Sequence, residues 1–180
     1  NEIPGYDGEL DMLLFYLPLA GSAFKKVYFD TVTRAAVSSF VEPQDLIVPY
    51  EASDLNTAER VTQVIAMSRN EIRKQQLAGF YADVEIKEGG AYLRRDEIDE
   101  EIDDIQGVSP SYNSDRDHLI YEVHTVLDLP GFEDIGEDGE PTGLKLPYIV
   151  TIDDSSRQVL AIRRNYRQND PFKRKINYFV

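Results

Sequence analysis

Residues 146–166 read LPYIVTIDDSSRQVLAIRRNY and give the clearest β-sheet signal in the chain. Two β-rich arms, 148–152 and 159–163, flank a polar turn at 153–156, whose Asp and Ser side chains can bond the neighbouring backbone. This pattern predicts a β-hairpin. Because an isolated hairpin is only marginally stable in water, we expect a third strand beside it.

The third strand is predicted at residues 119–129, LIYEVHTVLDL. Apolar and polar side chains alternate along this stretch, which is typical of a strand with one buried face. The sequence therefore predicts a three-stranded antiparallel meander near residues 119–166.

A second, smaller β unit is predicted near residues 23–50. Short strands are expected at 23–30, 37–41 and 46–48, with a break at Pro43 before the last of them. Three short strands in so few residues favour a barrel-like or meander unit.

The most distinct helix is predicted at about 69–78, directly after a strand at 60–67. Ser68 is a strong N-cap residue and Glu71 completes a capping box, while Gly79 is suited to the left-handed residue that ends a helix. Its buried side is expected to contain Ile72, Gln76 and Leu77.

A second main helix is predicted at about 95–106, RDEIDEEIDDIQ, with a thin stripe of isoleucines among carboxylates. A solvated face is the simple interpretation, and an acidic docking surface is the alternative. Residues 9–17 predict a shorter helix that ends near Leu17, because Pro18 disfavours helical geometry in the residue before it. This helix either faces the core or packs on another part of the protein.

Together these patterns predict an α+β fold that is mainly antiparallel sheet. The start at Asn1 and the apolar, strand-like end lead us to expect that residues 1–180 are a fragment of a larger protein. The expected sub-parts are a small β unit at 17–67, a helical part at 68–107 and the β meander at 118–180.

Composition limits the function classes. The chain has no cysteine, which excludes disulfides and thiol chemistry, and its net charge of −14 opposes nonspecific binding to nucleic acid. No apolar run approaches the roughly 18–20 residues of a membrane span. Residues 83–104 hold ten acids against three basic residues, and 128–140 add six acids, whereas 157–175 hold seven basic residues and one acid.

We identify no catalytic, cofactor-binding or metal-binding residues in the sequence. His118 and His124 lie six residues apart in one strand, too far to share a metal ion. The acidic loop 131–143 lacks the spacing of a calcium loop, and glycine-rich phosphate loops are missing. Asp153 and Asp154 are expected to serve the hairpin turn.

The basic stretch 163–175 is the one region suited to phosphate contact, with Tyr166 and Phe172 as stacking residues. Basic residues that protect a sheet edge from pairing are the commoner explanation for such a pattern. The candidate subunit or DNA contacts are Arg163, Arg164, Arg167, Lys173, Arg174 and Lys175.

Several segments resemble, in collinear order, the portal proteins (head-to-tail connectors) of short-tailed, podovirus-like bacteriophages. The resemblance extends over essentially the whole chain. The segments that carry it are LPLAGSAFKKVYFD at 17–30, VEPQDLIVPY at 41–50, RVT at 60–62, MSRNEIR at 67–73, LDL at 127–129, PYIVTI at 147–152, and residues 159–165 and 173–180.

The resemblance implies a structural component rather than an enzyme, with no cofactor and no catalytic residues to transfer. Portal proteins form a ring, typically of twelve subunits, at one capsid vertex, where they meet terminase, capsid and tail adaptor proteins. DNA is packaged and ejected through the ring, so a place in the virion, assembled in the bacterial host cytoplasm and without a membrane, is expected. This chain most resembles the wing region, with the clip as second choice.

Two other functions are considered. A nucleic-acid-binding module would use the stretch 163–175 and would bind DNA in a salt-sensitive way. A metal-dependent hydrolase would need a cluster of carboxylates around an ion, which the sequence does not indicate.

Overall fold

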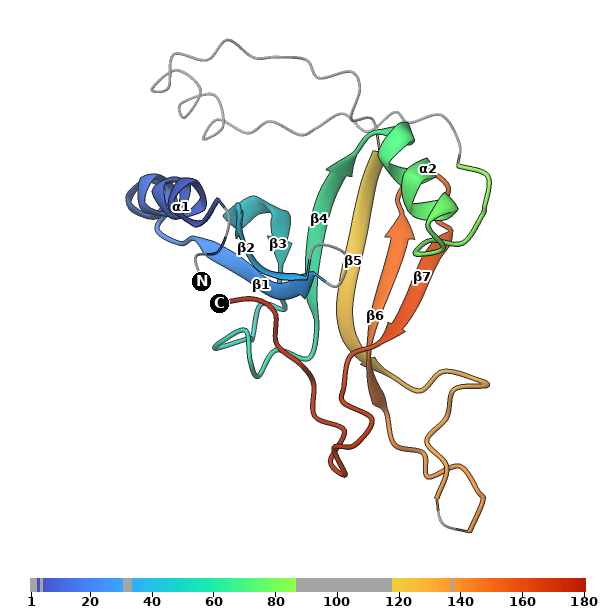
Figure 1. The fold of residues 1–180 in the computed structure, drawn as a ribbon. Coiled ribbons are helices and arrows are strands. Elements are labelled where there is room, and N and C mark those ends of the chain that lie inside the picture. Colours follow the sequence, from blue (N-terminus) through green and yellow to red (C-terminus); the bar gives the residue numbers. More distant parts are fainter. Residues whose placement is uncertain (1–2, 4, 31–33, 87–117, 137) are drawn as a thin grey trace. The chain divides into compact units, whose positions relative to one another are not determined.

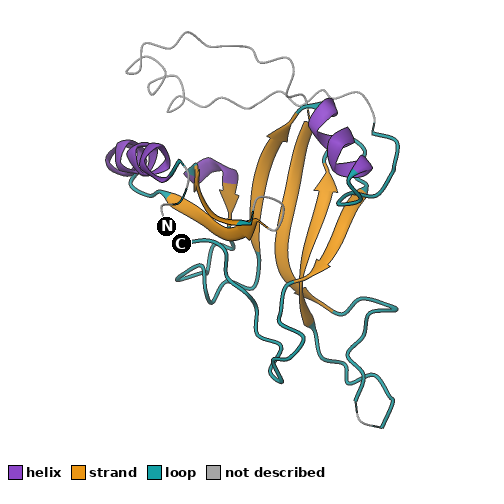
Figure 2. Cartoon of the chain, viewed as in Figure 1, coloured by secondary structure: helices purple, strands orange, loops and turns teal. Residues whose placement is uncertain are grey.

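The computed structural model describes residues 3, 5–30, 34–86, 118–136 and 138–180, and it has the predicted α+β fold with two antiparallel sheets (Figures 1 and 2). The predicted helix at 95–106 lies outside the described residues. In chain order the elements are α1 (Tyr6–Ala20), β1 (Phe24–Asp30), β2 (Ala35–Val41), the 3-10 helix η1 (Pro43–Asp45), β3 (Leu46–Ile47), β4 (Val61–Met67), α2 (Arg69–Leu77), β5 (His118–Leu127), β6 (Leu146–Asp153) and β7 (Val159–Arg164).

The larger sheet has the strand order β3-β4-β5-β6-β7, so the predicted meander is confirmed as β5-β6-β7. Residues 146–151 of β6 are all buried, which explains why this strand reads as a nearly continuous apolar run. The hairpin turn begins at Asp153, whose N–H donates to Gln158 O at 3.0 Å. The Asp153 side chain is fully buried, and its carboxylate accepts a hydrogen bond from the Ser156 N–H of the turn.

The predicted three-stranded unit at 23–50 is a two-stranded sheet, β1-β2, paired from Phe24↔Val41 to Asp30↔Ala35. The third strand, β3, pairs with β4 instead, because η1, with Pro43 in its first turn, separates it from β2. The outer edge of β1 is bonded by the C-terminal residues: Lys25 and Val180 exchange two backbone hydrogen bonds of 2.9 Å.

Helix α1 does not end at Leu17 as predicted but continues through Pro18 to Ala20. A proline near the last turn removes only one helical hydrogen bond, and Gly21, at φ 74°, closes the helix by donating its N–H to Leu17 O at 3.0 Å. Only Tyr16 of α1 is buried, and its ring lies 5.0 Å from that of Phe40.

Helix α2 has the predicted capping box. The Glu71 N–H donates to Ser68 Oγ at 3.2 Å, and the Ser68 N–H donates to Glu71 Oε2 at 2.8 Å. Ile72 and Gln76 are buried as expected, but Leu77 is 74% exposed, because it lies about 140° around the helix axis from Ile72.

The described chain forms two compact units, each with its own core. Unit 1 comprises Asn1–Gln63, Val123–Ile149 and Arg163–Val180, and unit 2 comprises Val64–Glu122 and Val150–Ile162. The core of unit 1 contains Val41, Leu46, Ala58, Val61 and Phe179, and the core of unit 2 contains Ile72, Ile86, Ile120 and Leu160.

Candidate functional site

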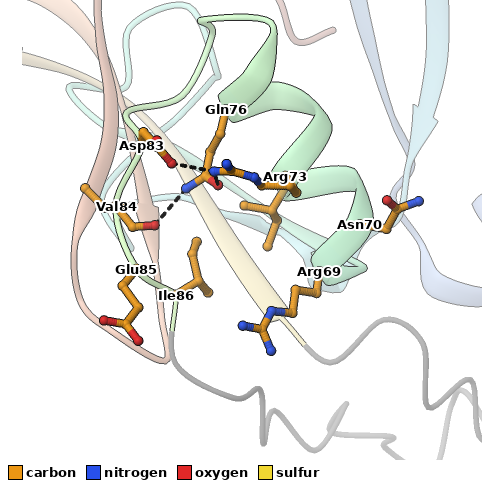
Figure 3. A pocket seen from close by; sticks show the side chains of 9 residues that line it. Arg69, Asn70, Arg73, Gln76, Asp83, Val84, Glu85 and Ile86 are labelled. Carbon is orange, nitrogen blue, oxygen red and sulfur yellow. Dashed lines mark hydrogen bonds and ion pairs between the residues drawn. The ribbon is translucent and has the colours of Figure 1, made fainter.

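A groove of about 660 Å³ lies beside α2 in unit 2 (Figure 3). Its walls come from one side of α2 and from the segment 83–86 that follows the helix. It is lined by Arg69, Asn70, Ile72, Arg73, Gln76, Asp83, Val84, Glu85 and Ile86.

The central polar groups of this groove are already bonded to one another. The buried Gln76 amide donates to Val84 O at 2.8 Å and to Ala82 O at 3.1 Å, which fixes the following segment along the helix. Arg73 forms an ion pair with Asp83 and donates to Gln76 Oε1 at 3.1 Å (Figure 3). The groove is therefore explained by the packing of 82–84 on α2, and the described residues that line it include no nucleophile with an adjacent base.

Three of the predicted contact residues, Lys173, Arg174 and Lys175, bond identified groups within the chain. Lys173 forms an ion pair with Asp134, and Arg174 pairs with Asp170, with 2.9 Å between Nε and Oδ2. The Lys175 ammonium donates to Ala58 O at 2.7 Å. Burial lowers the pKa of Lys175, although the nearby Asp54 carboxylate acts in the opposite direction. These three residues stabilise the C-terminal segment.

The remaining three, Arg163, Arg164 and Arg167, are exposed. Arg163 and Arg164 are neighbours on β7, so their side chains leave opposite faces of the strand. Arg167 follows the strand, in a turn where the Asp170 N–H donates to its carbonyl oxygen at 3.0 Å. The six basic residues therefore do not form one continuous cationic surface.

Both histidines are buried. His124 packs edge-on against the rings of Tyr178 and Phe179, with centroids 5.4 and 5.1 Å away, and His118 lies beside Asp153. In the acidic loop, Asp134 accepts a 2.9 Å hydrogen bond from Thr142 Oγ1 in addition to its pair with Lys173. Among the described residues, no three His, Cys, Asp or Glu side chains are grouped to hold a metal ion.

Unit 1 exposes several large apolar side chains on α1 and β1. On α1, Leu14 is 57% exposed and Leu17 is 43% exposed, and on β1 Phe29 is 63% exposed. The signal in the sequence is the apolar composition of α1 on nearly every side, which is compatible with a core helix or with one that packs on another protein surface. None of the described helices is long and apolar enough to cross a membrane.

No family model matches the chain, and no curated protein matches it significantly.

Proposed function

We propose that this chain is a structural component of a bacteriophage portal ring, through which DNA is packaged into the capsid and later ejected. The proposal rests on the collinear resemblance of its segments to portal proteins of short-tailed phages. The observation in the fold that supports it best is the exposed apolar surface of unit 1, because exposed apolar side chains that lie together mark a surface that another protein covers.

The exposure of α1 suits an assembly subunit. A helix that is apolar on nearly all sides is normally buried, yet α1 buries only Tyr16. Single exposed leucines are common on protein surfaces, but Met12, Leu14, Leu17 and Leu19 are all exposed on one helix of fifteen residues. A neighbouring subunit would bury these side chains.

The charges are compatible with a channel that does not hold DNA. A net charge of −14 repels phosphate groups, and the pairing of Lys173 and Arg174 with acids reduces the cationic surface that would bind them. In this proposal the chain belongs to the wing region, the ring contains about twelve subunits, and the assembly meets terminase, capsid and tail adaptor proteins.

The decisive experiment is negative-stain electron microscopy of the full-length protein. Rings with a central hole are expected, and a protein that stays monomeric at every concentration tested would contradict the proposal. A gel-shift assay with duplex DNA at low salt provides a second test. Tight, salt-sensitive binding by the chain itself would favour a nucleic-acid-binding module instead.

A further inference from the structure

The acidic loop 131–143 is fastened to the C-terminal segment of unit 1. The Asp134 carboxylate forms an ion pair with the Lys173 ammonium, and these side chains are 12% and 27% exposed. Thr142 Oγ1 donates to the same carboxylate at 2.9 Å, and the Thr142 N–H donates to Asp134 O at 2.8 Å. The loop therefore folds back around Asp134 and holds its carboxylate on one lysine.

A second contact fixes the start of the loop. The Tyr148 hydroxyl donates to Phe132 O at 2.9 Å, and the Tyr148 side chain is buried. Burial raises the pKa of this hydroxyl, while the nearby Arg164 guanidinium lowers it and the nearby Glu133 carboxylate raises it. Glu133 and Arg164 thus lie near the same phenol group and carry opposite charges.

The backbone brings Arg164 and Lys173 to the same part of unit 1. Asn165, which follows Arg164, accepts a 3.0 Å hydrogen bond from the Ile176 N–H, and its side-chain amide donates to Ile176 O at 3.1 Å. Lys173 lies three residues before Ile176 in the same segment. Both basic residues therefore have an acid of the loop nearby, and these two acids, Glu133 and Asp134, are consecutive in the sequence.

The carboxylate of Asp134 holds the position that a phosphate oxygen would take on Lys173. Both groups are anionic acceptors for the same ammonium group, so only one of them can form the close pair. Glu133 lowers the positive potential around Arg164 in the same way, although without a direct pair. Arg174 is different, because its partner Asp170 belongs to its own turn and lies outside the loop.

We propose that the acidic loop is an autoinhibitory element, which screens Lys173 and Arg164 from the phosphate groups of duplex DNA. Removing its two carboxylates uncovers a salt-sensitive DNA contact at these residues. The inference goes beyond the proposed function and does not depend on it, because it concerns the binding of DNA by the chain itself.

The test is a gel-shift titration with a short DNA duplex at low salt. Glu133→Gln with Asp134→Asn removes both charges and keeps the size of the side chains. This variant is expected to bind the duplex at least ~10-fold more tightly than the natural chain. Asp128→Asn with Glu140→Gln is the matched control, since it removes the same charge from two exposed positions, and it should bind as the natural chain does.

A third substitution shows where the uncovered contact lies. Lys173→Gln, added to the variant without Glu133 and Asp134, should abolish most of the gain in affinity. It should also make the dependence of log K on log salt shallower by about one, the change for a single lost phosphate contact. Lys74→Gln removes the same charge from an exposed position on α2 and should leave the gain intact.

Three outcomes would overturn the inference. An equal gain in the Asp128 and Glu140 control would show that only the net charge matters. Unchanged binding without Glu133 and Asp134 would show that the loop screens nothing, and tight binding by the natural chain would show that it does not inhibit.

Circular dichroism verifies that each variant is folded. If the double substitution in the loop prevents folding, Glu133→Gln and Asp134→Asn are measured singly. Asp134→Asn is then expected to give the larger gain, because Asp134 pairs directly with Lys173. No gain from either single substitution would refute the screening.

Discussion

His118 Nδ1 lies 3.7 Å from Asp153 Oδ1, and both side chains are buried in unit 2. Neither of these two atoms has a hydrogen-bond partner among the described residues. The other carboxylate oxygen, Asp153 Oδ2, accepts bonds from Ser155 Oγ at 2.6 Å, Ser156 N at 2.8 Å and Ser156 Oγ at 2.6 Å. One buried side chain therefore holds the β6-β7 turn beside the first residue of β5.

Replacing Asp153 by Asn should destabilise the hairpin. An amide can keep one accepting oxygen, but it loses the charge that strengthens the bonds from Ser155 and Ser156. We expect a loss of about 1–3 kcal/mol in the free energy of unfolding, measured by urea denaturation. Asp128→Asn, at an exposed position, is the matched control and should be nearly neutral. Equal effects of the two substitutions would contradict this role of Asp153.

The pKa of Asp153 also predicts how the stability of the chain changes at low pH. Burial acts to raise the pKa of Asp153, but the hydrogen bonds from Ser155 and Ser156 and the nearby His118 outweigh it, so the pKa lies below its usual value. The folded chain then binds fewer protons than the unfolded chain. The resulting stability is complete above the unfolded pKa of about 4 and is lost as the pH falls through the folded pKa. Urea denaturation between neutral pH and pH ~2 should show a weaker pH dependence in Asp153→Asn than in the natural chain.

The capping box of α2 provides a local test. Ser68→Ala removes the hydroxyl that accepts the Glu71 N–H, and it should cost about 1 kcal/mol of stability. Asn70→Ala, at an exposed position on the same helix, should not destabilise the chain. Urea denaturation of both variants measures the difference, and an equal loss in both would mean that the cap contributes nothing specific.

Features set by neighbouring residues were predictable from the sequence. The capping box of α2 and the Asp and Ser turn of the hairpin both depend on residues within a few positions of each other. The partner of β3 could not be predicted in this way, since β4 begins fourteen residues after Ile47. The partners of the predicted contact residues could not be predicted either, because they lie far away in the sequence. Lys173 bonds Asp134, and Lys175 bonds Ala58.

Ile72 and Leu77 were both predicted on the buried side of α2, but substitutions at the two positions should have very different effects on stability. Ile72 is 1% exposed in the core of unit 2, so Ile72→Ala should cost about 2–5 kcal/mol. Leu77 is 74% exposed, and Leu77→Lys should change the stability by less than about 0.5 kcal/mol. If Leu77→Lys destabilises the chain as much as Ile72→Ala does, another surface covers Leu77 in solution.

The C-terminal residues should contribute as much to stability as a core strand, through Phe179. This side chain is 6% exposed, packs with Val41 and Val61 in the core of unit 1, and lies edge-on to His124 with ring centroids 5.1 Å apart. Its neighbours Tyr178 and Val180 bond the edge of β1, so the backbone fixes the ring in the core. Phe179→Ala should therefore cost about 3–5 kcal/mol by urea denaturation.

Phe172→Ala is the control for that substitution, because it removes the same side chain from a position that is 79% exposed in the same segment. In a dilute, monomeric sample its effect should be within about 0.5 kcal/mol, since little apolar surface leaves water there on folding. Both substitutions replace a phenylalanine by alanine, and the two side chains differ in how deeply they are buried. A loss of stability in Phe172→Ala comparable with that in Phe179→Ala would mean that the whole segment, rather than only its last residues, is held in the core.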